Sequence, residues 1–173
     1  AALVGFGSRS RRASVEALAR TLFAAGFDRV LAVQIPAARF SIHLDCLMTL
    51  VDVDLVLIDR RLRRSSAVEL RPRGEGVATR IHPSVEAALA DALGLDAMRV
   101  VEVADEHEQW RLAANTLALR PGRVVAYAHN ERTNEALAAA GVEVRGVPGE
   151  ELSRGHGGPR CLTCPLRRDA ADP

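Results

Sequence analysis

The sequence predicts an α/β fold that is built from repeated ββαβ units. Short apolar runs suited to β-strands alternate along the chain with amphipathic stretches suited to helices. The order strand, strand, helix, strand occurs twice, each time beginning with a hairpin. Units of this kind bury their faces against neighbouring units, which indicates a repeated architecture.

Three helices are expected from their apolar spacing and from the signals at their ends. They cover residues 14–25, 83–93 and 131–140. Gly26, Gly94 and Gly141 follow the last turns, where a left-handed residue commonly ends a helix. Asn130 stands at the N-cap position of the third helix.

The expected strands are short and lie between these helices. They cover residues 3–6, 30–35, 45–53, 55–58, 67–70, 99–103, 116–119, 124–127 and 142–147. Residues 52–54 suit a tight hairpin turn, and Pro121-Gly122 suits a second one. These turns define the two hairpins of the repeated unit.

The composition indicates a globular chain and excludes several classes of protein. Of its 173 residues, 48% are hydrophobic, and the net charge of +1 argues against a dedicated nucleic-acid binder. No stretch reaches the roughly 18 uninterrupted apolar residues of a membrane span. Three cysteines, an odd number, argue against a disulfide framework and predict a cytoplasmic location.

One cysteine has the surroundings of a reactive thiol. Cys161 follows Gly157, Gly158 and Arg160, polar and flexible neighbours that a buried structural cysteine rarely has. His43 and Asp45 are two residues apart, so on a strand both would point to the same face. A cysteine, a histidine and an acid far apart in sequence are the components of a thiol-nucleophile enzyme.

Other interpretations of the cysteines and histidines remain open at this stage. The spacing of Cys161 and Cys164 could be a redox pair, but no thioredoxin-type strand-to-helix junction precedes it. It could be half of a zinc site, which would need a second pair of ligands. Cys46 is expected in the core and Cys164 in a structural position. His82, His107 and His129 are expected at the surface.

Four stretches of the chain, taken together, resemble the arginine deiminases of bacteria. Residues 5–10 resemble a segment with a substrate-binding arginine, and residues 40–52 resemble the histidine motif. Residues 120–127 with 130–134 resemble a further block, and residues 155–166 resemble the cysteine motif. They span nearly the whole chain in the order and spacing of that family.

The resemblance implies the guanidino-group-modifying, or pentein, superfamily, whose fold is an α/β propeller of five ββαβ blades around a central site. It implies that residues 1–173 are the C-terminal portion of the catalytic domain, because the N-terminal blades and their two further carboxylates are absent. We therefore expect a partial propeller that lacks full activity by itself. A homo-oligomer is compatible with this picture.

The implied reaction hydrolyses a guanidino compound, with L-arginine as the expected substrate, to L-citrulline and ammonia. By resemblance, Cys161 attacks the guanidinium carbon and forms a thiouronium adduct, and neither a metal nor an organic cofactor takes part. His43 would protonate the leaving ammonia and then deprotonate the incoming water. Asp45 would accept hydrogen bonds from the guanidinium nitrogens.

The rest of the implied substrate site departs in part from the family pattern. Arg9 would bind the α-carboxylate of the substrate, with His156 and Gly157 beside it. His156 stands where the family usually has a second arginine, and Ser8 stands where an acid normally precedes Arg9.

Residues 113–114 are alanines in place of a glycine and a polar residue. These departures leave two alternatives open, namely a non-catalytic guanidino-binding relative and an amidinotransferase.

Overall fold

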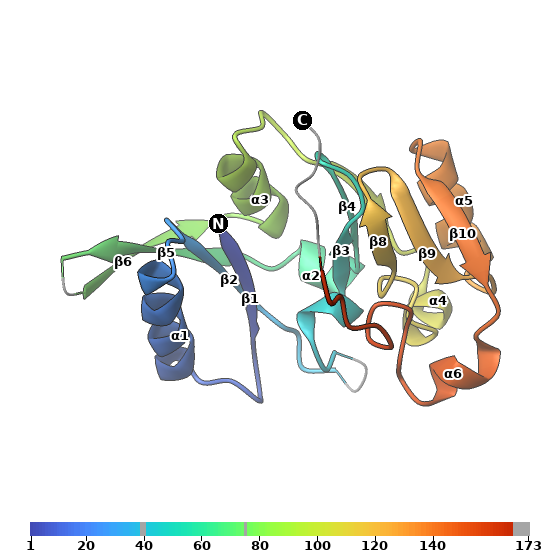
Figure 1. Cartoon of the computed structure of the whole chain (residues 1–173), viewed down its shortest axis with the longest axis horizontal. Coiled ribbons are helices and arrows are strands. Elements are labelled where there is room, and N and C mark those ends of the chain that lie inside the picture. The colour runs from blue at the N-terminus through green and yellow to red at the C-terminus, as the bar shows by residue number, and fades with distance from the viewer. Residues whose placement is uncertain (39–40, 75, 168–173) are drawn as a thin grey trace. The chain divides into compact units, whose positions relative to one another are not determined.

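The strands of the chain form three sheets that belong to two units (Figure 1). The computed structural model describes residues 1–38, 41–74 and 76–167. Unit 1 comprises residues 1–44 and 60–98, and unit 2 comprises residues 45–59 together with the chain from residue 99 onward. The predicted α/β class is confirmed. Phe40, at the start of the predicted histidine motif, lies outside the described residues.

Unit 1 is a four-stranded mixed sheet in the order β1-β2-β5-β6. Its elements are β1 (Ala2–Phe6), α1 (Arg12–Ala24), β2 (Val30–Gln34), α2 (Arg60–Arg63), β5 (Ala67–Arg73), β6 (Gly76–His82) and α3 (Val85–Leu93). β1 runs parallel to β2, and the pairings of β2 with β5 and of β5 with β6 are antiparallel.

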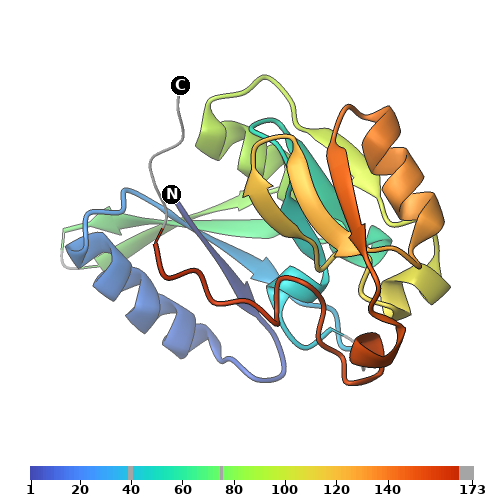
Figure 2. The ribbon, with the colours of Figure 1, turned by 45° about the vertical axis from the view of Figure 1, so that its right-hand side comes forward.

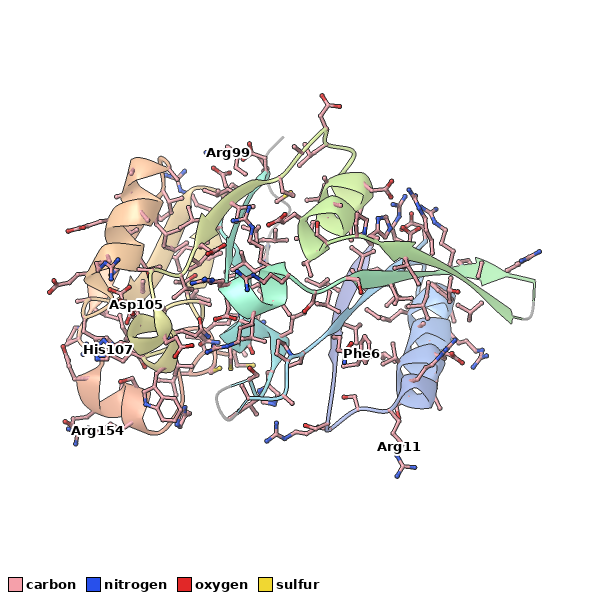
Figure 3. All side chains as sticks on the ribbon, turned by 180° about the vertical axis from the view of Figure 1, so that it is seen from behind. Phe6, Arg11, Arg99, Asp105, His107 and Arg154 are labelled. Atoms are coloured by element: carbon pink, nitrogen blue, oxygen red, sulfur yellow. The ribbon has the colours of Figure 1, made fainter. Side chains whose placement is uncertain are left out.

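The two longer helices of unit 1 cover different faces of this sheet, because side chains alternate along each strand. Val15 of α1 belongs to a core cluster with Val30 and Leu70. The neighbouring residue Glu69 lies within 4.8 Å of Asp91 on α3, so α3 covers the opposite face. Figure 3 shows Arg11, at the start of α1, pointing away from the unit.

Unit 2 contains two three-stranded sheets, β3-β4-β7 and β10-β9-β8. Its strands are β3 (Met48–Leu50), β4 (Leu55–Ile58), β7 (Arg99–Glu102), β8 (Leu117–Arg120), β9 (Arg123–Tyr127) and β10 (Glu143–Val147), and its α-helices are α4 (Glu106–Trp110), α5 (Glu131–Ala139) and α6 (Glu150–Arg154). The order β8, β9, α5, β10 confirms one predicted ββαβ unit.

Helix α5 lies beside β10 and closes the core of unit 2 (Figure 2). Leu137 of α5 is completely buried in a cluster that includes Leu57 of β4 and Val124 of β9. Burying each such side chain stabilises the fold by about 1.5–3 kcal/mol. Because the cluster takes side chains from β4 and β9, it holds the two sheets of unit 2 together. The loop that carries Cys161 therefore starts from a well-packed support.

One predicted strand was wrong, and one predicted helix cap differs in its chemistry. Residues 45–53 were expected to form one strand, but residues 44–46 form a 3-10 helix and the strand is only Met48–Leu50. Asn130 occupies the N-cap position of α5, as predicted, but its side chain makes no capping hydrogen bond. The carboxylate of Glu108 accepts the N–H groups of Arg132 and Thr133 instead.

The second hairpin-helix-strand unit is interrupted. The strands of its hairpin, β3 and β4, pair with each other as predicted, and β4 also pairs with β7. Strands β5 and β6 come between them in sequence but belong to the sheet of unit 1.

Within the described part of the chain, no helix is long and apolar enough to cross a membrane.

Candidate functional site

Unit 2 brings the predicted nucleophile and the predicted acid into direct contact. Cys161 Sγ lies 3.5 Å from Asp45 Oδ2, although 116 positions separate the two residues in sequence. Asp45 lies in the 3-10 helix that leads into β3, and Cys161 lies in a turn beyond α6. The thiol is exposed and the carboxylate is partly buried, so a small cation could reach both groups.

A third residue, which the sequence did not single out, connects these two segments. Asn115 is completely buried, and its side-chain Oδ1 accepts the backbone N–H of Cys161 at 3.1 Å. Its Nδ2 donates to the backbone oxygen of Asp45 at 2.9 Å. The sequence around Asn115 gives no sign that its side chain would bond to residues 46 and 70 positions away.

Two contacts hold the glycine-rich loop, one at Gly157 and one at His156. The hydroxyl of Tyr127 donates to the backbone oxygen of Gly157 at 2.7 Å. His156 adopts a left-handed backbone conformation with φ of 56°, which is uncommon outside glycine. Its ring meets that of Trp110 edge to face, with centroids 4.7 Å apart.

Burial shifts the pKa values of two titrating groups in unit 2. Burial first, and then the nearby charge of Cys161, raise the pKa of Tyr127, so its phenol stays protonated and donates to Gly157. Burial first, and then the positive charge of Arg111, lower the pKa of His129. His129 is therefore a neutral, buried ring and not the surface residue that was expected.

Unit 1 contains the other two predicted functional side chains, and both line one pocket. Its volume is about 650 Å³, and Arg9 and His43 contribute to its wall. Both side chains are exposed, as ligand-binding groups must be. Ser41 also lines the pocket, and its buried hydroxyl has no hydrogen-bond partner among the described residues.

A separate polar cluster in unit 1 was missed by the sequence interpretation. His82 Nε2 lies 2.8 Å from Glu69 Oε2, and both side chains are almost completely buried. His82 was expected at the surface, but its strand places it under α3. Glu69, His82 and Asp91 lie within 4.8 Å of one another, yet Arg71 pairs with Glu69 and Arg29 pairs with Asp91. These positive charges oppose binding of a metal cation there.

The three cysteines are free thiols that differ in exposure. Cys46 is buried, which confirms its assignment to the core. Cys164 is exposed, so its expected structural position is wrong. It lies in the C-terminal turn region, where the chain has few apolar neighbours to cover it.

Comparison with known proteins identifies relatives of the whole chain. The model of the family described as arginine deiminase matches residues 1–168. A protein named arginine deiminase from Rhodococcus erythropolis is 44% identical over 174 residues, covering 96% of this chain and 43% of the relative. One of the same name from Mycolicibacterium gilvum is 45% identical with the same coverage. The chain thus spans less than half the length of these curated relatives.

Solved structures with the same fold have much lower sequence identity. The N-terminal domain of ArgZ, an arginine dihydrolase from cyanobacteria, matches with a TM-score of 0.64 at 17% identity, covering 94% of this chain and 50% of that one. An inosamine-phosphate amidinotransferase from Streptomyces griseus matches with a TM-score of 0.65 at 18% identity, covering 98% of this chain and 44% of that one. These matches show that the chain shares its mixed α/β fold with enzymes of this kind.

Proposed function

The chain belongs to the arginine deiminase family, and we propose that it carries the thiol chemistry of a guanidine-hydrolysing enzyme. The observation that carries this proposal is the 3.5 Å contact between Cys161 Sγ and the Asp45 carboxylate. A nucleophile beside an acid that can hold a planar cation is the minimum that such a reaction needs. The proposed substrate is L-arginine, and the proposed products are L-citrulline and ammonia.

Asp45 would hold the guanidinium next to the sulfur. A guanidinium N–H donates to a carboxylate at about 2.8 Å, and this charge-assisted bond fixes the plane of the group. Cys161 Sγ lies near the same carboxylate oxygen, so the electrophilic carbon would lie within the roughly 3–3.5 Å of a near-attack geometry. Binding and alignment would thus come from one residue.

The substrate itself would help to release the thiol proton. Without substrate the Cys161 thiol donates to Asp45 Oδ2. A bound guanidinium takes over the carboxylate and adds a positive charge beside the sulfur, which stabilises the thiolate by Coulomb attraction. The nucleophile would therefore form when substrate is present.

The proposed reaction then runs in two steps. The thiolate forms a C–S bond to the guanidinium carbon, and the C–NH2 bond breaks once that nitrogen has received a proton, which releases ammonia. Water gives up one proton to a base as it adds to the thiouronium carbon. The C–S bond then breaks, the second proton of the water goes to the sulfur, and the neutral ureido product leaves with the thiol restored. We assign the protonation of the leaving nitrogen and the deprotonation of the water to His43, which must come within hydrogen-bond distance of the adduct for this role.

Arg9 would recognise the α-carboxylate of the substrate. It lines the pocket of unit 1 together with His43, and an arginine can bind a carboxylate through two parallel hydrogen bonds. We propose that His156 and the backbone of Gly157 complete the contacts to the substrate. The proposal includes a five-bladed propeller for the complete catalytic domain, with residues 1–173 as its C-terminal portion, and a cytoplasmic location.

The test measures the products formed from L-arginine. The 173-residue chain is assayed alone and joined to the parts of the Rhodococcus erythropolis relative that it does not cover. Citrulline and ammonia should appear with the joined protein, and Cys161→Ala should reduce the rate by at least about 10⁴-fold because the nucleophile is lost. Cys164→Ser is the matched control, since Cys164 is an exposed thiol three positions away.

Other outcomes would contradict the proposal in distinct ways. Arginine binding without ammonia release would indicate a non-catalytic relative. Ornithine in place of citrulline, formed only when an amine acceptor is supplied, would indicate an amidinotransferase. Citrulline formation that survives Cys161→Ala would exclude Cys161 as the nucleophile.

A further inference from the structure

The side chain of Asn115 connects the two segments that carry the reacting groups. Its Oδ1 accepts the backbone N–H of Cys161 at 3.1 Å, and its Nδ2 donates to the backbone oxygen of Asp45 at 2.9 Å. The two bonds use opposite ends of one amide. They reach 46 positions forward and 70 positions back along the chain, so they join segments that have no local connection.

The amide is held in a dry and tightly packed position. Asn115 has no exposed surface, so water cannot replace either bond. Gly158 lies directly against it, since a Cβ on Gly158 would be only 2.4 Å from Asn115 Oδ1. The backbone N–H of Arg160 also donates to the backbone oxygen of Asn115, at 3.3 Å. The loop before Cys161 therefore packs closely against Asn115 and is hydrogen-bonded to it.

The strand beside Asn115 keeps its backbone in place. The hydroxyl of Thr49, on β3, donates to the backbone oxygen of Ala114 at 2.8 Å. The backbone N–H of Asn115 donates to the oxygen of Leu112 at 3.0 Å. A side chain on a fixed backbone with both polar ends bonded has one available position.

We propose that Asn115 is a positioning residue that sets the distance between the Cys161 sulfur and the Asp45 carboxylate. This inference rests on the proposed function and deepens it, because it names what aligns the nucleophile with the group that holds the cation. Asn115 does not touch the reacting atoms, and it acts through the backbones of the two residues that do. A misplacement of about 1 Å at a reacting centre can reduce a rate by about 100-fold.

The test uses two alkylating probes that differ in charge. 2-Chloroacetamidine is a planar cation that resembles a guanidinium, and 2-chloroacetamide is its neutral counterpart. In both cases the Cys161 thiolate forms an S–CH2 bond, chloride leaves, and a thioether remains. The measured quantity is the ratio of the two alkylation rates, divided by the same ratio for N-acetylcysteine. The 173-residue chain with Cys164→Ser is used, and the labelled peptide is identified by mass spectrometry.

A cation held by Asp45 beside the sulfur should raise this ratio by about 10-fold or more in the parent chain, as expected for a charge-assisted contact. Asp45→Asn should return the ratio to about 1. Asn115→Leu should lower it about 10-fold as well, while the rate with 2-chloroacetamide and the circular dichroism spectrum stay unchanged. A merely structural role would alter the spectrum or both rates together.

The chain offers a matched control beside Asn115. Thr116 is 1% exposed, and its hydroxyl has no hydrogen-bond partner among the described residues. Thr116→Val therefore changes a neighbouring buried polar group of similar size without removing a bond, and the ratio should stay within about 2-fold of the parent value.

A second variant keeps the proposal testable if Asn115→Leu does not fold. Gly158→Ala pushes the Asn115 amide aside while every polar group is retained, and it should also lower the ratio. A parent ratio near 10 that either folded variant leaves unchanged would overturn the positioning role alone. A parent ratio of 1 that Asp45→Asn does not alter would instead overturn the role of Asp45 in the proposed function, and the positioning role with it.

Discussion

Replacing Gly149 with alanine should destabilise unit 2, because the ring of Tyr127 occupies the space that a side chain would need. A Cβ on Gly149 would lie 2.1 Å from both Cδ1 and Cε1 of Tyr127. The φ of Gly149 is −167°, outside the left-handed region that favours glycine. The predicted loss of stability therefore rests on the steric overlap with Tyr127.

The magnitude follows from the overlap. Carbon atoms in contact lie about 3.5–4.0 Å apart, so the ring must move by more than 1 Å. Tyr127 is 2% exposed, and its movement would also break the hydrogen bond to Gly157. Overpacking costs about 1–3 kcal/mol and the lost bond about 1 kcal/mol, which gives about 2–4 kcal/mol in total.

The assay is urea denaturation at pH 7 followed by circular dichroism, and Gly155→Ala is the matched control. A Cβ on Gly155 would meet only the backbone oxygen of Leu152 at 3.5 Å, an ordinary contact, and its φ is −80°. This control should change the free energy of unfolding by less than about 0.5 kcal/mol. If Gly149→Ala were as stable as Gly155→Ala, the inferred packing of Tyr127 over Gly149 would be wrong.

Three further predictions concern buried polar groups. Burial raises the pKa of Tyr127 above the 10.0 of the free phenol, so the unfolded chain loses this proton first as the pH rises. The free energy of unfolding should therefore fall above pH 10. Urea denaturation at a series of pH values should show a smaller fall in Tyr127→Phe. Burial lowers the pKa of His129 below 6.5, so the unfolded chain gains this proton first as the pH falls. The free energy of unfolding should therefore decrease below pH 6.5, by up to about 1.4 kcal/mol per pH unit. An equal dependence on pH in His129→Phe would show that His129 is not its cause. Glu69→Leu leaves the buried ring of His82 without its hydrogen-bond partner and should cost about 1–3 kcal/mol. Combining it with His82→Leu should recover part of this loss. Simple additivity in the double-mutant cycle would show that the pair is not coupled.

The parts of the fold that could be predicted from the sequence are those with buried, periodic side chains. Helices α1, α3 and α5 begin and end within about two residues of the predicted bounds, because Gly94 and Gly141 give clear end signals. Strand β6 was missed because most of its side chains are exposed or half-buried at the edge of its sheet, so its apolar alternation is weak. Helices α4 and α6 have five residues each, too few to show a period.

The site divides in the same way. Cys161 and Asp45 could be singled out because their residue types carry chemistry, and the structure brings them together. Asn115 could not, since its contacts lie 46 and 70 positions away and depend on how β3 and the C-terminal turn are placed. Ala113 and Ala114 were interpreted as changes in the substrate shell, but both are buried in the core of unit 2, where their small size serves packing.

Reactivity and geometry are supplied by different kinds of residue in unit 2. The reacting thiol is exposed and its acid is partly buried, so changing either should remove the chemistry with little loss of stability. The groups that hold them in place, Asn115, Gly158 and Tyr127, are buried and closely packed. Substitutions there should lower the free energy of unfolding and shift the alignment, even where the folded chain keeps its secondary structure. Rates measured on such variants therefore need the charged and neutral probes side by side, because only their ratio separates a shifted site from a weakened fold.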